Sequence, residues 1–151
     1  MINSICFVCH GNICRSPMAE FMFKDILSCK GLSDVIIVES RATSTEEIGN
    51  PPHCGAVLKL AQYGIVPFGK TAVQLTRSDG EKYDLIIGMD DANIRNILRI
   101  VGDKYSGKVH KLLSFAGSDR SIADPWYTNN FDETYEDIKE GLDGLVTYLG
   151  I

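Results

Sequence analysis

The chain has 151 residues, of which 44% are hydrophobic, and this is enough for one domain of common size with a buried core. Fifteen basic and twenty acidic residues leave a formal net charge of -5, so the chain lacks the basic surface that attracts nucleic-acid phosphates. No apolar run approaches the roughly 18 residues of a membrane span, and no basic segment typical of a secretion signal opens the chain. We expect a single domain over residues 1–151, with neither nucleic acid nor a membrane as partner.

Cysteine usage indicates the compartment. The five cysteines are odd in number, lie in the first half of the chain, and lack the paired spacings of zinc sites and of secreted disulfide frameworks. We therefore expect a cytoplasmic protein that uses neither a metal nor another cofactor.

Hydrophobic patterning predicts strands and helices in alternation. Short apolar runs typical of buried parallel strands occupy residues 5–8, 35–38, 85–87 and, more weakly, 109–113. Helical spacing of apolar residues, with proline near the start or glycine near the end, predicts helices over 16–31, 51–64, 91–102 and 132–149. This alternation predicts an α/β fold, a doubly wound, four-stranded parallel sheet flanked by helices, with a ligand site beyond the carboxyl ends of the strands.

A long connection separates the fourth predicted strand from the last helix. It runs from residue 114 to about residue 130, is rich in Gly, Ser, Asp and Asn, and carries Asp124-Pro125 near its middle. Loops of this length in compact domains tend to be functional or disordered. In the helix that follows, Gly141 and Gly144 are expected to weaken the structure locally.

The most informative stretch runs from Cys9 to Ser16, between the first strand and the first helix, and reads Cys-His-Gly-Asn-Ile-Cys-Arg-Ser. A cysteine and an arginine separated by five residues can close a tight loop whose backbone N–H groups point inward, and the following helix adds the positive end of its dipole. The pattern therefore predicts an anion site. The residues expected to line it are His10, Gly11, Asn12, Ile13, Cys14 and Ser16.

Two side chains of this loop can act on a phosphate-like anion. The inward amides, the helix dipole and Arg15 all favour the thiolate form of Cys9, which is the nucleophilic form. Arg15 can bind two oxygens of the anion with its planar guanidinium, and the same geometry suits a phosphoryl group in transit. Ser16 either donates a hydrogen bond to the sulfur or caps the helix, and the sequence leaves both roles open.

The segment from Val8 to Glu20, Val-Cys-His-Gly-Asn-Ile-Cys-Arg-Ser-Pro-Met-Ala-Glu, resembles the signature of the low-molecular-weight protein tyrosine phosphatases. The resemblance extends to Ser40 at the end of the second predicted strand, to Gly-Met-Asp at 88–90, and to Asp124-Pro125. It implies the family fold of four parallel strands, which agrees with the pattern above, and hydrolysis of phosphotyrosine in proteins.

The resemblance also implies a role for each reacting side chain. Cys9 attacks phosphorus, and Arg15 binds the phosphate and stabilises the transition state. Asp124 protonates the leaving tyrosine oxygen and then acts as a base toward water, a kind of assistance typically worth about 10²–10⁴-fold in rate.

Several further positions match the family and are expected to support the loop. Cys14 is either a small core residue or, as in the family, the partner that forms a disulfide with oxidised Cys9, and we favour the redox role. By resemblance, Asn12 adopts a left-handed backbone and bonds Ser40. Asp90 either orients the arginine of the loop or caps the helix that follows it.

Aromatic and acidic residues are expected around the mouth of the site. Trp126 and Tyr127 follow the acid directly and either wall a slot for a flat phenyl phosphate or pack under the long loop. Where relatives often carry an aromatic residue on the opposite rim, this chain has Glu46 and Glu47. These carboxylates either disfavour acidic residues beside the phosphotyrosine and favour basic or small substrates, or form a solvated rim. Lys70 stands where many relatives have a histidine.

The implied partners are tyrosine-phosphorylated proteins or peptides, with inorganic phosphate and oxyanions such as vanadate as inhibitors. An arsenate reductase uses a similar loop but needs further cysteines downstream, and this chain has none after Cys54. A protein arginine phosphatase is a closer alternative, against which the aromatic wall argues. A non-catalytic phosphate-binding module would have no reason to keep both Cys9 and Asp124.

Overall fold

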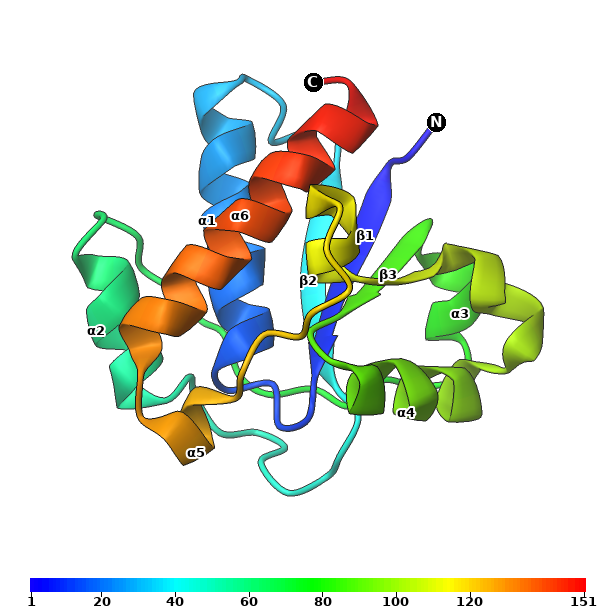
Figure 1. Cartoon of the computed structure of the whole chain (residues 1–151), viewed down its shortest axis with the longest axis horizontal. Helices are drawn as coiled ribbons and strands as arrows, with labels where there is room; N and C mark the ends of the chain where they lie inside the picture. Colours follow the sequence, from blue (N-terminus) through cyan, green and yellow to red (C-terminus); the bar gives the residue numbers. More distant parts are fainter.

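Four strands pair in parallel in the order β2-β1-β3-β4 (Figure 1). The computed structural model describes all residues from 1 to 151, and it confirms the predicted α/β fold. In chain order the elements, with 3-10 helices written η, are β1 (Ser4–Cys9), α1 (Arg15–Cys29), β2 (Ile37–Ala42), α2 (Cys54–Ala61), α3 (Asp79–Lys82), β3 (Leu85–Gly88), α4 (Asp91–Val101), η1 (Asp103–Lys108), β4 (Val109–Lys111), η2 (Leu112–Ala116), α5 (Pro125–Thr128) and α6 (Phe131–Leu149).

Alternating side chains of β1 divide the core into two layers. Ile5, Phe7 and Cys9 belong to the larger hydrophobic cluster, which they share with residues of α1, α2 and α6. Cys6 and Val8 point the other way, into a smaller cluster with α4. Figure 1 shows α1 and α6 on one side of the sheet and α3 and α4 on the other. The sheet is therefore covered on both faces, with β1 in its interior.

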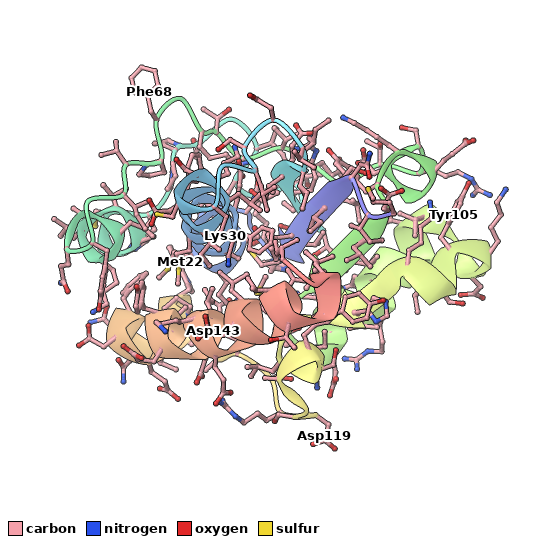
Figure 2. The ribbon with its side chains drawn as sticks, turned by 90° about the horizontal axis from the view of Figure 1, so that it is seen from above. Met22, Lys30, Phe68, Tyr105, Asp119 and Asp143 are labelled. Atoms are coloured by element: carbon pink, nitrogen blue, oxygen red, sulfur yellow. The ribbon has the colours of Figure 1, made fainter.

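Figure 2 shows how side chains divide between core and surface when the molecule is seen from above. Met22, on the side of α1 that faces α6, is 5% exposed, whereas Phe68 stands out from a loop and is 90% exposed. No helix of the protein combines the length and the apolar character that crossing a membrane would need.

The strand order creates a switch point at the carboxyl end of β1. From β1 the chain passes through α1 to β2 on one side, and it later reaches β3 on the other side. Loops that leave neighbouring strands at such a point diverge and form a crevice for a ligand. The loop of residues 10–14 follows β1 here, and Asp90 lies just beyond the end of β3.

The second strand lies later in the chain than predicted. The prediction placed it at 35–38, but β2 begins at Ile37, and Val35 and Ile37 are 50% and 60% exposed. Because β2 is an edge strand, alternation of buried and exposed residues marks it rather than a continuous apolar run. Ser40, expected at the end of the strand, lies inside it and pairs with Phe7 of β1.

The fourth strand is shorter than the predicted 109–113. It ends at Lys111, and Leu112 and Leu113 are buried in η2 instead. The short α3 and η1 were not predicted, because four and six residues are too few to show a helical period.

Two helix starts differ from their predictions. The helix expected from Pro51 begins at Cys54, where the His53 ring caps it by accepting the Gly55 N–H at 2.9 Å. The first helix begins at Arg15 without a side-chain cap, so Ser16 lies inside its first turn. The hydroxyl of Ser16 is therefore free for another partner.

Gly141 and Gly144 have a packing role that the sequence did not reveal. A Cβ atom on Gly144 would collide with the backbone carbonyl of Phe115, and one on Gly141 would collide with the side chain of Leu112. The two glycines therefore let α6 lie directly against η2, and this close approach compensates for their low helix propensity.

Candidate active site

Asn12 sets the shape of the loop that follows β1. Its backbone is left-handed, with φ of 59°, and the residue is fully buried. Its Nδ2 donates to Oγ of Ser16 at 2.8 Å and to Oγ of Ser40 at 2.9 Å, and its Oδ1 accepts the Val73 N–H at 3.1 Å. A left-handed residue other than glycine costs roughly 1–2 kcal/mol, and three hydrogen bonds at about 1 kcal/mol each offset that cost.

The Cys9 sulfur faces three hydrogen-bonding groups. The backbone N–H groups of Asn12 and Ser16 donate to Sγ at 3.3 Å and 3.4 Å, and Oγ of Ser16 lies 3.0 Å away. Hydrogen bonds to the charged form of a group favour that form, so this arrangement suits a thiolate. Of the two roles that the sequence left open for Ser16, the structure has the contact with sulfur and not the helix cap.

The guanidinium of Arg15 is buried beside the loop, and the residue is 2% exposed. Nη1 donates to Oδ2 of Asp90 at 2.6 Å and to the Ile122 carbonyl at 2.9 Å, while Nη2 lies 3.4 Å from Oδ2 of Asp124. Burial by itself lowers the pKa of Arg15, but the negative charges of Cys9 and the two aspartates outweigh burial and raise it above its ordinary value. A permanent positive charge therefore lies in a nearly closed site.

Asp90 fills both of the roles that the sequence left open. While Oδ2 accepts from Arg15, Oδ1 accepts the Asn93 N–H at 2.7 Å and caps α4. The Asn93 side chain completes a capping box by accepting the N–H of Asp90 at 3.2 Å. One carboxylate thus ties Arg15 to the start of a helix on the opposite face of the sheet.

Asp124 reaches the same site from the long connection. Its Oδ1 accepts the Trp126 N–H at 3.0 Å and caps the short α5, while Oδ2 faces Arg15. Its side chain is 23% exposed, so it contacts both the guanidinium and solvent. The Asp124 side chain therefore caps the turn that begins at Pro125 with one oxygen and points its other oxygen into the site.

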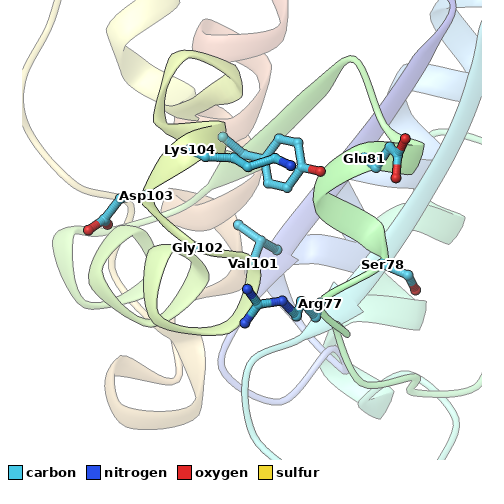
Figure 3. Close-up of a pocket in the computed structure, with 8 residues that line it drawn as sticks. Arg77, Ser78, Glu81, Val101, Gly102, Asp103 and Lys104 are labelled. Carbon is cyan, nitrogen blue, oxygen red and sulfur yellow. The ribbon is translucent and has the colours of Figure 1, made fainter.

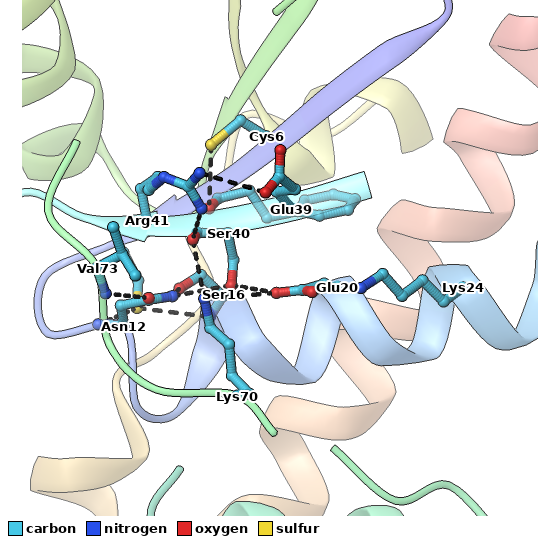
Figure 4. Close-up of polar contacts among 12 residues, drawn as sticks. Cys6, Asn12, Ser16, Glu20, Lys24, Glu39, Ser40, Arg41, Lys70 and Val73 are labelled. Carbon is cyan, nitrogen blue, oxygen red and sulfur yellow. Dashed lines mark hydrogen bonds and ion pairs between the residues drawn. The ribbon is translucent and has the colours of Figure 1, made fainter. Parts of the chain in front are cut away.

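A polar network behind the loop was not predicted (Figure 4). Oγ of Ser40 donates to Glu20 at 2.5 Å, and Lys24 donates to the other carboxylate oxygen at 2.6 Å. Nζ of Lys70 donates to the Ser40 carbonyl at 3.0 Å and lies 3.7 Å from Glu20. Glu20 follows Ser16 by four residues, so both lie on one face of α1, and that spacing was the signal available in the sequence.

Lys70 differs from the surface lysines because its side chain is only 8% exposed. Burial lowers the pKa of Lys70, and the charge of Glu20 opposes this only in part. Lys70 therefore serves as a buried donor to the strand that carries Ser40.

A pocket of about 110 Å³ opens above these residues. Its walls come from the loop after β1, from the loop after β2, and from the turn that begins α5. The lining residues are His10, Gly11, Ile13, Cys14, Glu46, Glu47, Asp124, Trp126 and Tyr127. All were expected around the site. Asn12 and Ser16 were expected to line it as well, but both are fully buried and neither lines the pocket. The lining also lacks Cys9, Arg15, Ser40 and Asp90.

The two aromatic residues that line the pocket, Trp126 and Tyr127, differ in how far they are packed against other side chains. The Trp126 ring meets the His53 ring edge to face at 5.7 Å, and the His53 ring stacks on Phe131 at 5.3 Å. Tyr127 is 83% exposed. His53 therefore packs between Phe131 and Trp126 and supports one side of the pocket.

A larger groove of about 490 Å³ lies between α3 and the turn after α4 (Figure 3). Its lining residues are Arg77, Ser78, Glu81, Val101, Gly102, Asp103, Lys104 and Tyr105. None of them was expected at the site, whereas the smaller pocket is lined by Asp124 and by residues of the loop that follows Cys9.

Comparison with known proteins gives concordant results. Residues 4–150 match the family model described as low molecular weight phosphotyrosine protein phosphatase. The low molecular weight protein-tyrosine-phosphatase PtpA of Staphylococcus epidermidis is 40% identical over 146 residues, which cover 96% of this chain and 92% of that protein. YfkJ of Bacillus subtilis, a protein of the same description, is 41% identical over 145 residues, which cover 95% of this chain and 93% of that protein.

Solved structures agree with these sequence matches. The crystal structure of Bacillus subtilis YfkJ superposes with a TM-score of 0.95 at 39% identity, covering 99% of this chain and 96% of that one. The low molecular weight protein tyrosine phosphatase from Streptococcus pyogenes superposes with a TM-score of 0.88 at 41% identity, covering 98% and 93%.

Proposed function

The chain belongs to the low molecular weight phosphotyrosine protein phosphatase family, and on that premise we propose that it hydrolyses phosphotyrosine in proteins through a phosphocysteine intermediate. The observation that supports this most is the Cys9 sulfur, which has three hydrogen-bonding groups at 3.0 Å, 3.3 Å and 3.4 Å. A cysteine that only fills core space needs no such partners, whereas a nucleophilic thiolate is stabilised by them.

In the first step the phosphoryl group binds in the loop, with its oxygens held by backbone N–H groups and by Arg15. The sulfur of Cys9 attacks phosphorus, and the S–P bond forms as the bond from phosphorus to the tyrosine oxygen breaks. Protonated Asp124 gives its proton to that oxygen. The 3.4 Å contact between Arg15 and Asp124 is long for a charge-assisted hydrogen bond, so Nη2 is available to a phosphate oxygen.

In the second step water attacks the phosphocysteine. Asp124, now a carboxylate, takes a proton from the water as its oxygen bonds to phosphorus. The S–P bond breaks, its electron pair returns to Cys9, and inorganic phosphate leaves. The Ser16 hydroxyl, 3.0 Å from Sγ, stabilises the departing thiolate.

The walls of the pocket favour a phenyl ring over a guanidinium. Ile13, Trp126 and Tyr127 supply apolar surface next to the loop, and a flat ring gains free energy by packing against it. Inside the pocket, beside apolar Ile13, the charged guanidinium of phosphoarginine would lose hydration that a basic side chain at the exposed rim keeps. We therefore place phosphotyrosine ahead of phosphoarginine as substrate, with phosphate and vanadate as competitive ligands of the loop.

The first test compares turnover of phosphotyrosine, phosphoarginine and arsenate side by side, with p-nitrophenyl phosphate as a reference substrate. We expect phosphotyrosine to have the highest kcat/KM, vanadate to inhibit, and Cys9→Ser to abolish turnover because an alkoxide does not form at neutral pH. Cys29→Ala, at an exposed cysteine outside the pocket, is the matched control and should retain full activity. Undiminished turnover in Cys9→Ser would refute the mechanism.

A second test isolates the acid. Asparagine caps a helix as well as aspartate does, so Asp124→Asn keeps the start of α5 but removes the carboxyl group that gives and takes the proton. We expect kcat on phenyl phosphate to fall by about 10²–10⁴-fold, and to fall much less on a phosphate ester whose leaving group needs no protonation. Equal losses on both esters would exclude Asp124 as the acid.

We also propose that Cys14 protects oxidised Cys9. Cys14 is 4% exposed, and burial, followed by the nearby charge of Cys9, raises the pKa of Cys14 to about 12. After peroxide converts Cys9 to a sulfenic acid, the Cys14 thiolate attacks that sulfur, the S–O bond breaks as the disulfide forms, and the departing hydroxide takes a proton from solvent to become water. Thiols of a reducing compartment such as the cytoplasm then restore both cysteines.

The raised pKa gives this protection a pH dependence. Only the thiolate of Cys14 attacks, and below its pKa the thiolate fraction grows about tenfold per pH unit, so disulfide formation should be faster at pH 9 than at pH 7. Activity recovered by dithiothreitol after peroxide treatment measures the protection. We expect Cys14→Ala to lose this recovery and Cys29→Ala to keep it, and recovery in Cys14→Ala equal to the unmodified protein would exclude the role.

A further inference from the structure

The mouth of the pocket carries more negative charge than the proposed reaction uses. Glu46 and Glu47 line it together with Asp124, and the only basic side chain of the lining is His10. Arg15 lies deeper, is 2% exposed, and already contacts two carboxylates. Even with His10 protonated, the ionised carboxylates of the lining outnumber its cations.

Glu46 is the rim carboxylate most available to a bound peptide. Its side chain is 68% exposed, and its Oε2 lies 3.0 Å from Nε2 of His10, which holds it at the edge of the pocket. Glu47 is engaged within its own loop, because its Oε2 accepts from Asn50 at 2.7 Å and its Cγ lies against Gly11.

The aromatic residues that line the same pocket as Glu46 also suit a cation. Trp126 and Tyr127 are 58% and 83% exposed, and both line the pocket. Exposed aromatic faces attract lysine and arginine head groups and pack against their aliphatic stems. The Glu46 carboxylate and the aromatic rings around one pocket therefore form a surface that a basic side chain can contact.

We propose that Glu46 makes this site prefer phosphotyrosine peptides with lysine or arginine directly beside the phosphotyrosine. This preference rests on the phosphotyrosine hydrolysis proposed above and specifies its substrate class. When the phenyl ring fills the pocket, the residues before and after it lie over the rim. A basic neighbour there meets Glu46 and the aromatic wall, whereas an acidic neighbour is repelled.

The size of the effect follows from the exposure of the rim. An exposed ion pair changes an equilibrium by a factor of up to about five, so exchanging lysine for glutamate beside the phosphotyrosine should change kcat/KM by about tenfold. The contact exists both before and during the chemical step, so the change should appear in KM rather than in kcat. It should shrink as added salt shortens the Debye length below its value of about 8 Å at 0.15 M.

The test uses two phosphotyrosine peptides that differ only in lysine or glutamate on both sides of the phosphotyrosine, and it measures the ratio of their kcat/KM values. We expect a ratio of about ten in favour of the lysine peptide for the unmodified protein. Glu46→Gln should bring the ratio close to one, and Glu46→Lys should invert it. Glu81→Gln, the same change in the groove beside α3 (Figure 3), should leave the ratio unchanged.

Each outcome bears on a distinct claim. Equal kcat/KM for the two peptides, or an unchanged ratio in Glu46→Lys, would overturn the assignment of Glu46 while leaving phosphotyrosine hydrolysis intact. Absence of turnover on both peptides would overturn the proposed function, and the peptide preference with it. Because each ratio is taken within one variant, a general loss of activity cannot imitate a change in preference.

Discussion

The buried side chain of Asn12 donates two hydrogen bonds and accepts one, and these three bonds fix the loop on which the rest of the site depends. Both hydrogens of its Nδ2 are used, one on Ser16 and one on Ser40, and its Oδ1 accepts the Val73 N–H. These contacts determine which group donates and which accepts in the rest of the network. Since Ser16 accepts from Asn12, its own hydroxyl hydrogen remains for the Cys9 sulfur, and Ser40 likewise donates onward to buried Glu20. The loop is therefore organised before any phosphate arrives, which lowers the cost of stabilising the transition state.

The parallel sheet brings two aspartates from other parts of the chain to the loop. Loops at the carboxyl ends of β1 and β3, together with the long connection before α5, bring Arg15, Asp90 and Asp124 into contact. Each aspartate uses one oxygen for a helix start and the other for the guanidinium, so the helices fix the direction of the charges. We infer that the buried charge of Arg15 and the two carboxylates that balance it form one electrostatic unit.

Sequence patterns predicted the main strands and helices because the signals for them are local. Proline and glycine punctuation, apolar spacing and the family-like segment from Val8 to Glu20 are each contained in a short window. The position of β2 was missed because buried and exposed residues alternate along this edge strand, so a continuous apolar run does not mark it. The apolar run used for the prediction starts at Val35, which lies before the strand and is exposed. The link from Glu20 to Lys70 joins residues 50 positions apart through Ser40, and only the fold brings them together.

The central claim is that Cys9 carries the phosphoryl group between the two steps. It is tested most directly in Asp124→Asn, where p-nitrophenyl phosphate still drives attack on phosphorus but the base for hydrolysis is missing. After rapid quenching, mass spectrometry should find the mass of one phosphoryl group on the peptide that contains Cys9, located at that cysteine. A phosphoryl group on Ser16 or on another residue, or turnover without any modified peptide, would contradict the account.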